Sequence, residues 1–324
     1  MQVDHRGPLG RAGGLAWLSW TLLSHVAGRF PPDIVGGLDK DQGVNTKKRP
    51  SLSSFRDLHV PGHPLLLANA WDVASALVTE AAGAQAIATT SAGLAWAAGY
   101  PDGNRLPRAL AVEATSRIVS AASVPVTADI EGGFGDTPEE VASSVGEFLD
   151  AGVVGINIED GTLDPADLAR RISAARSVAA ARGVDLFINA RTDVFLAGGD
   201  APDQLLAQAV SRALLYVEAG ADGVFVPGAA AALSIAALAE SIPVPLNIMA
   251  GPGSLSVEQL GTLGVARVSL GSSVAQSAYA LAASAYRGAA AGDYSVLEAG
   301  IPYGELNGLL SGTDGEGRTQ ARGE

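Results

Sequence analysis

Residues 125–160 read PVTADIEGGFGDTPEEVASSVGEFLDAGVVGINIED, and this stretch decides the fold class. It contains two short apolar runs, PVTADI (125–130) and GINIED (155–160), separated by an amphipathic helix-like segment, PEEVASSVGEFLDAGV. Strands that are apolar along their whole length are buried on both faces, which is typical of parallel sheets covered by helices. The stretch therefore predicts a strand–helix–strand unit with parallel strands.

The same unit repeats along the chain. Alanine-rich helical segments separate eight strand-like runs: PLLLAN (64–69), AIATT (86–90), PVTADI (125–130), GINIED (155–160), LFINAR (186–191), GVFVP (223–227), PLNIM (245–249) and ARVSLG (266–271). Glycines just before new strands fit helix C-termini that lead into short loops. Eight such units predict an α/β fold of the (β/α)8 TIM-barrel class. No G-x-G-x-x-G motif follows the first run, so nothing favours a dinucleotide-binding fold.

The organisation of the chain follows from this repeat. We predict an irregular N-terminal extension over residues 1–50 and a barrel over residues 51–290. Two helical stretches after the eighth run exceed one closing helix, which predicts extra C-terminal helices, including an element over residues 291–310. The tail over residues 311–324 is polar and rich in glycine, so we expect it to be disordered.

Composition limits the function. The chain is 48% hydrophobic and has no cysteine, which excludes disulfides, thiolate metal sites and a cysteine nucleophile. A net charge of −13 argues against nucleic acid and anionic membrane surfaces as partners. Apolar runs are too short for a membrane span, and Leu15–Leu23 is a poor signal segment because Asp4 precedes it. We expect a cytoplasmic protein, in which an anionic substrate needs a local cation.

Charged side chains collect after the second to fifth runs, at the edge where barrel enzymes carry their active sites. They are Asp102, then Asp129 and Glu131, then Glu159 and Asp160, and finally Arg191 and Asp193. The last three runs contribute little charge there. Clustered carboxylates require a cation among them, and an all-oxygen donor set favours Mg²⁺. Arg191 would hold a substrate carboxylate in bidentate fashion.

Structural interpretations exist for several of these residues. Asp129 alone could cap a helix or form an ion pair, and Asp136 and Asp72 are interpreted as a loop or N-cap residue and as an N-cap. His59 and His63 precede the first run and are expected at the surface. Because no histidine ends a strand, the pattern disfavours a histidine base or a zinc triad. The combination of acidic strand ends with one arginine carries the functional interpretation.

At these residues the sequence resembles the isocitrate lyase/phosphoenolpyruvate mutase superfamily over about residues 52–290. The resemblance rests on these motifs: LANAWDVASA, TTSAGLAWAAGYPDG, TADIEGGFGD, GINIEDG, INARTDVFL and PLNIMAGPGSLSVEQLGTLGVARVSLG. It implies a Mg²⁺-dependent barrel that stabilises the enolate of a small 2-oxo acid or dicarboxylate. It also implies a homo-oligomer, because the family packs its last helices against a neighbouring subunit.

The resemblance also implies roles for individual residues. Asp129 corresponds to the nearest metal ligand. The other residues that hold the metal, partly through water, correspond here to Glu131, Glu159 and Asp102. Arg191 corresponds to the residue facing the substrate carboxylate, so that Arg191, Glu159 and Asp102 form the expected catalytic set. The loop that grips the pyruvyl end of the substrate corresponds to Ser91, Gly93 and Leu94.

Departures from the family pattern limit the assignment of the reaction. GINIEDGTLDPADLARRI lacks the basic, cysteine-containing gating loop of the lyases, and the third run has Asp-x-Glu in place of Asp-x-Asp. We therefore expect a lyase- or mutase-type enzyme acting at a C–C or P–C bond. The alternatives are an oxaloacetate-type hydrolase, a carboxyphosphonate-type phosphonomutase, and a dicarboxylate-binding barrel without turnover.

Overall fold

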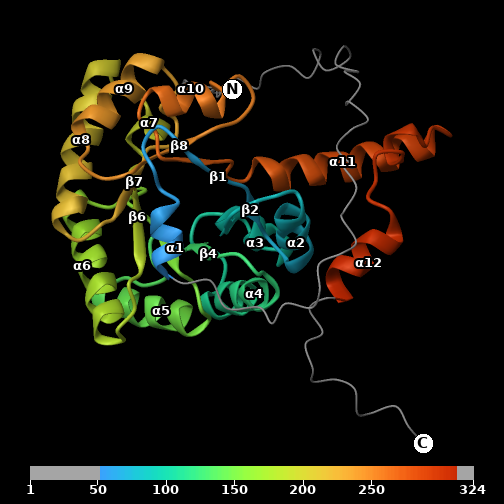
Figure 1. Cartoon of the computed structure of the whole chain (residues 1–324), viewed down its shortest axis with the longest axis horizontal. Helices are drawn as coiled ribbons and strands as arrows, with labels where there is room; N and C mark the ends of the chain where they lie inside the picture. Colours follow the sequence, from blue (N-terminus) through green and yellow to red (C-terminus); the bar gives the residue numbers. More distant parts are fainter. Residues whose placement is uncertain (1–51, 312–324) are drawn as a thin grey trace, which may run out of the picture. The chain divides into compact units, whose positions relative to one another are not determined.

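The computed structural model describes residues 52–311, and for residues 52–54 the backbone only. Within this part of the chain, nine parallel strands follow each other in the order β1-β9-β8-β7-β6-β5-β4-β3-β2. The first predicted run is divided at Ala68, so that β1 pairs with β9 and β2 pairs with β3. The sheet thus closes through one divided strand, and Figure 1 shows the helices around it. The predicted (β/α)8 barrel is confirmed.

All eight predicted runs contain a strand. The strands are β1 (Leu65–Leu67), β2 (Asn69–Ala70), β3 (Ile87–Thr89), β4 (Val126–Asp129), β5 (Gly155–Glu159), β6 (Phe187–Arg191), β7 (Gly223–Phe225), β8 (Leu246–Met249) and β9 (Arg267–Ser269). The helices around the barrel are α1 (Leu52–Asp57), α2 (Val73–Ala81), α3 (Ser91–Ala97), α4 (Arg108–Ala121), α5 (Pro138–Asp150), α6 (Pro165–Ala181), α7 (Val194–Ala197), α8 (Pro202–Glu218), α9 (Ala232–Ser241) and α10 (Val257–Thr262).

Local sequence explains where the helices begin. Asp72 caps α2 by accepting a hydrogen bond from the backbone N–H of Ser75 at 2.7 Å, as predicted. Thr137 caps α5 in a capping box with Glu140, while Asp136 lies in the loop before it. Such caps satisfy backbone donors that the first helical turn leaves free.

The core lies between the sheet and the helices. Ile156 and Ile158 of β5 are completely buried there, against α5 residues such as Val145 and Phe148. Burying one such side chain contributes about 1.5–3 kcal/mol. Because side chains alternate along a strand, the intervening residues of β5 point into the barrel.

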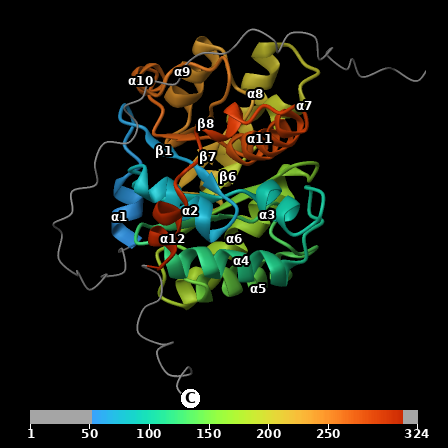
Figure 2. The ribbon, with the colours of Figure 1, turned by 90° about the vertical axis from the view of Figure 1, so that its right-hand side faces the viewer.

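Two C-terminal helices follow the barrel, as predicted. α11 (Ser273–Ala290) leads away from it, and α12 (Tyr303–Ser311) folds back against α2, with a 3₁₀ turn (Ser295–Leu297) between them (Figures 1 and 2). Along α11 only Ala275 is buried. No helix in residues 52–311 combines the length and hydropathy of a membrane span. The predictions for residues 1–50 and for the tail after residue 311 lie outside the described residues.

Candidate active site

The carboxyl ends of β4, β5 and β6 bring three of the predicted site residues together. Each ends its strand: Asp129 on β4, Glu159 on β5 and Arg191 on β6. The pairing register places Asp129 beside Asn157 and Glu159 beside Arg191. Since these strands are adjacent and parallel, their last side chains share one rim of the barrel.

Asp129 is held by groups from β3 and α3. Its Oδ2 atom accepts hydrogen bonds from the hydroxyl of Ser91 at 3.0 Å and from the backbone N–H of Ser91 at 3.3 Å. Its own backbone N–H donates to the hydroxyl of Thr89 at 2.9 Å. Ser91 was predicted to bind substrate, and the structure places it against the predicted metal ligand.

Gly93 and Leu94 pack inside the protein. A Cβ atom on Gly93 would lie 2.5 Å from Cγ2 of Thr90 and 2.8 Å from Cβ of Trp71, so only glycine fits there. Leu94 is 4% exposed and belongs to the hydrophobic core. The structure thus explains both residues by packing, and their contact with substrate stays a prediction.

Glu131 is a buried carboxylate with a strained backbone. Its φ of 49° lies in the left-handed region, which bulky residues rarely adopt outside functional sites. Its Oε2 atom accepts a hydrogen bond from the backbone N–H of Asn104, whereas Oε1 has no hydrogen-bond partner among the described residues. Burial, against the effect of the Asn104 N–H and with added contributions from the charges of Asp129 and Asp102, raises the pKa of Glu131 to about 7.

Arg191 lies between two carboxylates. Its Nε and Nη2 atoms donate to Asp193 at 2.6 and 3.0 Å, and Nη1 lies 2.5 Å from Oε2 of Glu159. Burial raises the pKa of Glu159, and Asp129 and Asp193 add to that effect against Arg191. Burial lowers the pKa of Arg191, but Glu159 and Asp193 raise it overall. A guanidinium has five N–H donors, so at least two remain for a ligand.

Asp160 has a structural role next to this group. It is completely buried, and Oδ2 accepts hydrogen bonds from the hydroxyl of Tyr216 at 2.7 Å and from Arg212 at 2.9 Å. Its Oδ1 atom accepts from the backbone N–H of Asp193 at 2.8 Å. Asp160 therefore positions Asp193, which in turn orients Arg191.

The carboxylates at this rim suit a hard divalent cation. In residues 55–311 no three His, Cys, Asp or Glu side chains are grouped so that together they could hold a metal ion. Mg²⁺, however, usually takes one or two carboxylates directly and keeps several waters. Asp129 and the unpartnered Oε1 of Glu131 offer such a donor set. Asp102 is exposed on the loop between α3 and α4.

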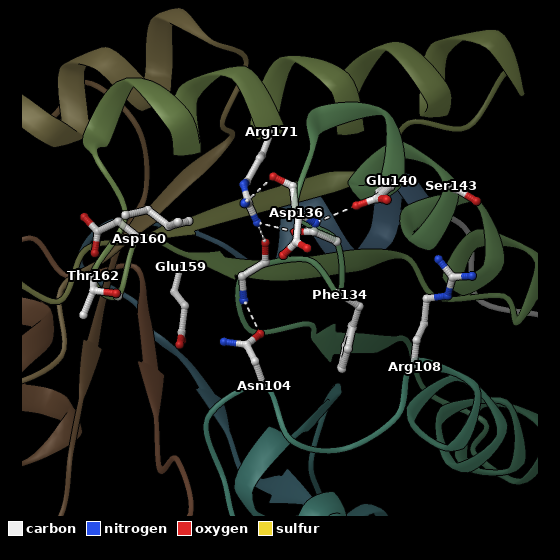
Figure 3. Close-up of a pocket in the computed structure, with 14 residues that line it drawn as sticks. Asn104, Arg108, Phe134, Asp136, Glu140, Ser143, Glu159, Asp160, Thr162 and Arg171 are labelled. Atoms are coloured by element: carbon white, nitrogen blue, oxygen red, sulfur yellow. Dashed lines mark hydrogen bonds between the residues drawn. The ribbon is translucent and has the colours of Figure 1, made fainter.

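A pocket of about 800 Å³ opens beside Glu159, between the loop after β4 and the start of α6. Figure 3 shows Glu159 on one side of it and Arg108 on the other. Arg171 of α6 holds the loop by donating to the carbonyl oxygens of Gly132, Gly135 and Asp136, at 2.6, 2.9 and 3.2 Å. The loop after β4 is therefore fixed by a buried arginine.

A barrel rim with three carboxylates and an arginine at adjacent strand ends agrees with the comparison of whole sequences. The sequence model of the family described as "Phosphoenolpyruvate phosphomutase" matches residues 55–290. The chain belongs to this family. Its members form a superfamily of lyases and mutases, so this protein is an enzyme of that class.

Individual relatives span different shares of the chain. An uncharacterised protein of Mycobacterium tuberculosis is 42% identical over 270 residues, which cover 82% of this chain and 98% of the relative. The 2-methylisocitrate lyase of Bacillus subtilis is 31% identical over 59% of this chain and 64% of its own length. The structure of a putative phosphonomutase from Burkholderia cenocepacia is 42% identical, covers 73% of this chain and 99% of its own, and has a TM-score of 0.71.

The barrel interior also contains a charged residue, Arg267, that is not among the predicted site residues. Arg267 of β9 is completely buried inside the barrel. Burial lowers its pKa to about 9, so the side chain stays charged at neutral pH, and Asp129 opposes this shift. Little charge was expected from the last strands, because Arg267 precedes the end of its strand by two residues. Alternation in ARVSLG, which puts residues 267 and 269 on one face, was the available signal.

The expected surface position of His59 is wrong. His59 is 6% exposed and stacks on the ring of Phe187, with ring centroids 4.1 Å apart. Its Nδ1 atom lies 2.9 Å from the carbonyl oxygen of Phe55, while His63 is exposed as predicted. His59 follows helix α1 and packs at the amino-terminal end of the barrel, and no local pattern in the sequence indicates that packing.

Proposed function

We propose that this protein is a Mg²⁺-dependent lyase or mutase that acts at a C–C or P–C bond next to the enolate of a small 2-oxo acid. The observation that carries the proposal is the convergence of Asp129, Glu131 and Glu159 beside Arg191 at one barrel rim. Four carboxylates there, counting Asp193, lie near one arginine at the rim, Arg191. An excess of negative charge of this kind favours a divalent cation.

Asp129 would hold the metal, with Glu131, Glu159 and Asp102 acting partly through water. Bound Mg²⁺ supplies positive charge that stabilises the oxygen on which the enolate charge develops. Arg191, oriented by Glu159 and Asp193, would direct its remaining N–H groups at the substrate carboxylate. Ser91 would keep the Asp129 carboxylate in place.

The relatives support this class of chemistry. A 25% identical solved structure, with a TM-score of 0.69, is a phosphonopyruvate hydrolase in complex with oxalate and Mg²⁺. An oxaloacetate decarboxylase of Pseudomonas entomophila is 34% identical over 48% of this chain. Oxalate resembles the enolate of pyruvate, because both present two adjacent oxygens with negative charge.

The short connection after β5 bears on which bond the enzyme breaks. Only residues 160–164 connect Glu159 to the start of α6 at Pro165, so the gating loop of the family's lyases is absent. The pocket of about 800 Å³ therefore opens directly beside Glu159. Because that loop and its cysteine are absent, the site is better suited to decarboxylation or hydrolysis of an oxaloacetate-like acid than to cleavage of isocitrate.

A direct assay tests the proposal. Purified protein is mixed with oxaloacetate, phosphonopyruvate or 2-methylisocitrate, with Mg²⁺ or with EDTA, and pyruvate formation and substrate loss are followed. We expect Mg²⁺-dependent turnover of at least one compound, and its loss in Asp129→Asn. The absence of turnover together with the absence of oxalate binding in the presence of Mg²⁺ would refute the proposal.

We also infer that α11 and α12 pack against a second copy of the chain. α11 leaves the barrel with large apolar side chains at its surface: Tyr279 is 44% exposed, Leu281 55% and Tyr286 78%. Large apolar side chains that are exposed together commonly mark a contact with another protein. A homo-oligomer joined through these helices would cover it.

A further inference from the structure

Arg267 lies across the interior of the barrel, beneath the carboxylates of the site. Its strand, β9, is separated from β5 by β8, β7 and β6 on one side and by the divided first strand, β3 and β4 on the other, so β9 and β5 face each other. The Nη2 atom of Arg267 donates to Oδ1 of Asn157 on β5 at 3.3 Å. Nε donates to the hydroxyl of Ser269, two residues nearer the rim, at 3.2 Å. The guanidinium therefore spans the barrel centre.

The charge of Arg267 has no carboxylate in contact with it. None of the Asp and Glu side chains in residues 55–311 forms an ion pair with Arg267, and its Nη1 atom has no hydrogen-bond partner there. Its bonded neighbours, Asn157 and Ser269, are neutral. An isolated buried cation is unfavourable, and it persists when charges elsewhere in the structure compensate for it.

The compensating charges lie one layer nearer the rim. Asn157, which accepts from Arg267, pairs with Asp129 in the sheet and is two residues before Glu159 on the same face of β5. Arg191 is different, because Glu159 and Asp193 contact it directly and offset its charge. Arg267 is therefore the second cation of this region, and its charge is not offset by a bonded partner.

We propose that Arg267 is a buried counter-charge that raises the affinity of the site for an anionic substrate without touching it. Its field reaches the rim from below, through an interior where charges are screened less than in water. The inference rests on the proposed function for the identity of the anion, a 2-oxo acid. It adds a residue, on a strand that carries no other charge, to the set that determines binding.

The proposal makes a prediction about sign. A cation beneath the site stabilises a bound anion and destabilises a bound cation, so removal of its charge should change the two affinities in opposite directions. A residue that only supports the fold would, when removed, weaken both. Changes of opposite sign in the anion and cation affinities therefore indicate an electrostatic role, and changes of the same sign indicate a structural role.

The experiment measures two dissociation constants by calorimetry: Mg²⁺ alone, and oxalate in the presence of saturating Mg²⁺. In Arg267→Met we expect oxalate to bind about tenfold or more weakly and Mg²⁺ to bind more tightly than in the parent. Arg267→Lys, which keeps the charge, is the matched control and should recover most of the oxalate affinity. Asn157→Asp is nearly isosteric and supplies Arg267 with a carboxylate partner, so it should change both affinities as Arg267→Met does.

Several outcomes would overturn the proposal. Weaker binding of both ligands in Arg267→Met, with a lowered melting temperature, would assign Arg267 a structural role. Unchanged affinities in Arg267→Met or, if that variant does not fold, in Asn157→Asp would show that the charge does not reach the site. A parent protein that binds Mg²⁺ but no oxalate would instead refute the proposed function, and the Mg²⁺ measurements would still test Arg267.

Discussion

The carboxylate of Asp129 accepts two hydrogen bonds from Ser91, one from the hydroxyl and one from the backbone N–H, both at Oδ2. The two residues are 38 positions apart in the sequence and meet because β3 and β4 are adjacent in the barrel. The pair leaves Oδ1 of Asp129 facing the N–H of Glu131 at 3.4 Å. Ser91 thus determines how the central carboxylate of the site is oriented.

Ser91→Ala should therefore weaken Mg²⁺ binding without unfolding the protein. Loss of a group that orients a metal ligand typically costs about tenfold or more in affinity. Calorimetric titration with Mg²⁺ checks the prediction, and Ser120→Ala, at an exposed serine of α4, serves as the control with unchanged affinity. Equal affinities in Ser91→Ala and the parent would argue against a positioning role.

Asp129→Ala should abolish Mg²⁺ binding and leave the fold intact. Asp129 lies at the centre of the acidic group, so its removal also relieves its repulsion of Glu131 and Glu159. Circular dichroism should show a native spectrum, and calorimetry should show no Mg²⁺ binding. Asp102→Asn, which changes an exposed carboxylate, should have a much smaller effect. Parent-like Mg²⁺ affinity in Asp129→Ala would show that the metal binds elsewhere.

Arg191→Ala should weaken oxalate binding in the presence of Mg²⁺ by about 2–5 kcal/mol, because a buried carboxylate contact is lost. Arg191→Lys should recover part of the lost affinity, since an ammonium group cannot make the two parallel hydrogen bonds of a planar guanidinium. Asp193→Asn tests the competing internal contact: it releases Nε and Nη2 of Arg191 and should leave oxalate binding equal or tighter. If all three variants bind oxalate like the parent, Arg191 serves an internal ion pair only.

His59 should make the protein less stable in mild acid. Burial lowers the pKa of His59 to about 3, and the nearby charges of Arg267 and Arg56 contribute. The unfolded chain takes up this proton at about pH 6.5, so the stability that neutral His59 contributes is complete above that pH and is lost as the pH falls toward 3. Between pH 7 and pH 5 the loss is about 2 kcal/mol.

Chemical denaturation at pH 7 and pH 5 checks this prediction. His59→Phe keeps the ring stacking on Phe187 and removes the titrating group. Its free energy of unfolding should decrease less between the two pH values than that of the parent, by about 2 kcal/mol. Parallel decreases in the two proteins would mean that His59 is not the group responsible.

Charge introduced on α11 should dissociate the proposed oligomer. Leu281→Asp combined with Tyr286→Asp places two carboxylates on the exposed apolar surface of this helix. Light scattering coupled to size-exclusion chromatography should show a multiple of the 32.6 kDa chain mass for the parent and a smaller species for the variant. A monomeric parent would contradict the inference, and unchanged mass in the variant would place the interface elsewhere.

Much of the fold was determined by the sequence alone. Alternating apolar runs and amphipathic segments predict the eight strand units, since burial on both faces of a parallel strand requires apolar side chains along its length. Asp72 as the cap of α2 followed from its position before a helical segment. The acidic strand ends Asp129 and Glu159 also followed, because topology places all carboxyl ends of a barrel on one rim.

Only the tertiary structure decided which partners these side chains have. Closure of the barrel brings Ser91 to Asp129 and places Arg191 between Glu159 and Asp193. It also lets Arg267 of β9 reach Asn157 on the opposite strand. It also buries His59 against Phe187. Local sequence patterns encode burial and periodicity, whereas such contacts depend on strand register and on distances across the barrel, which no short segment contains.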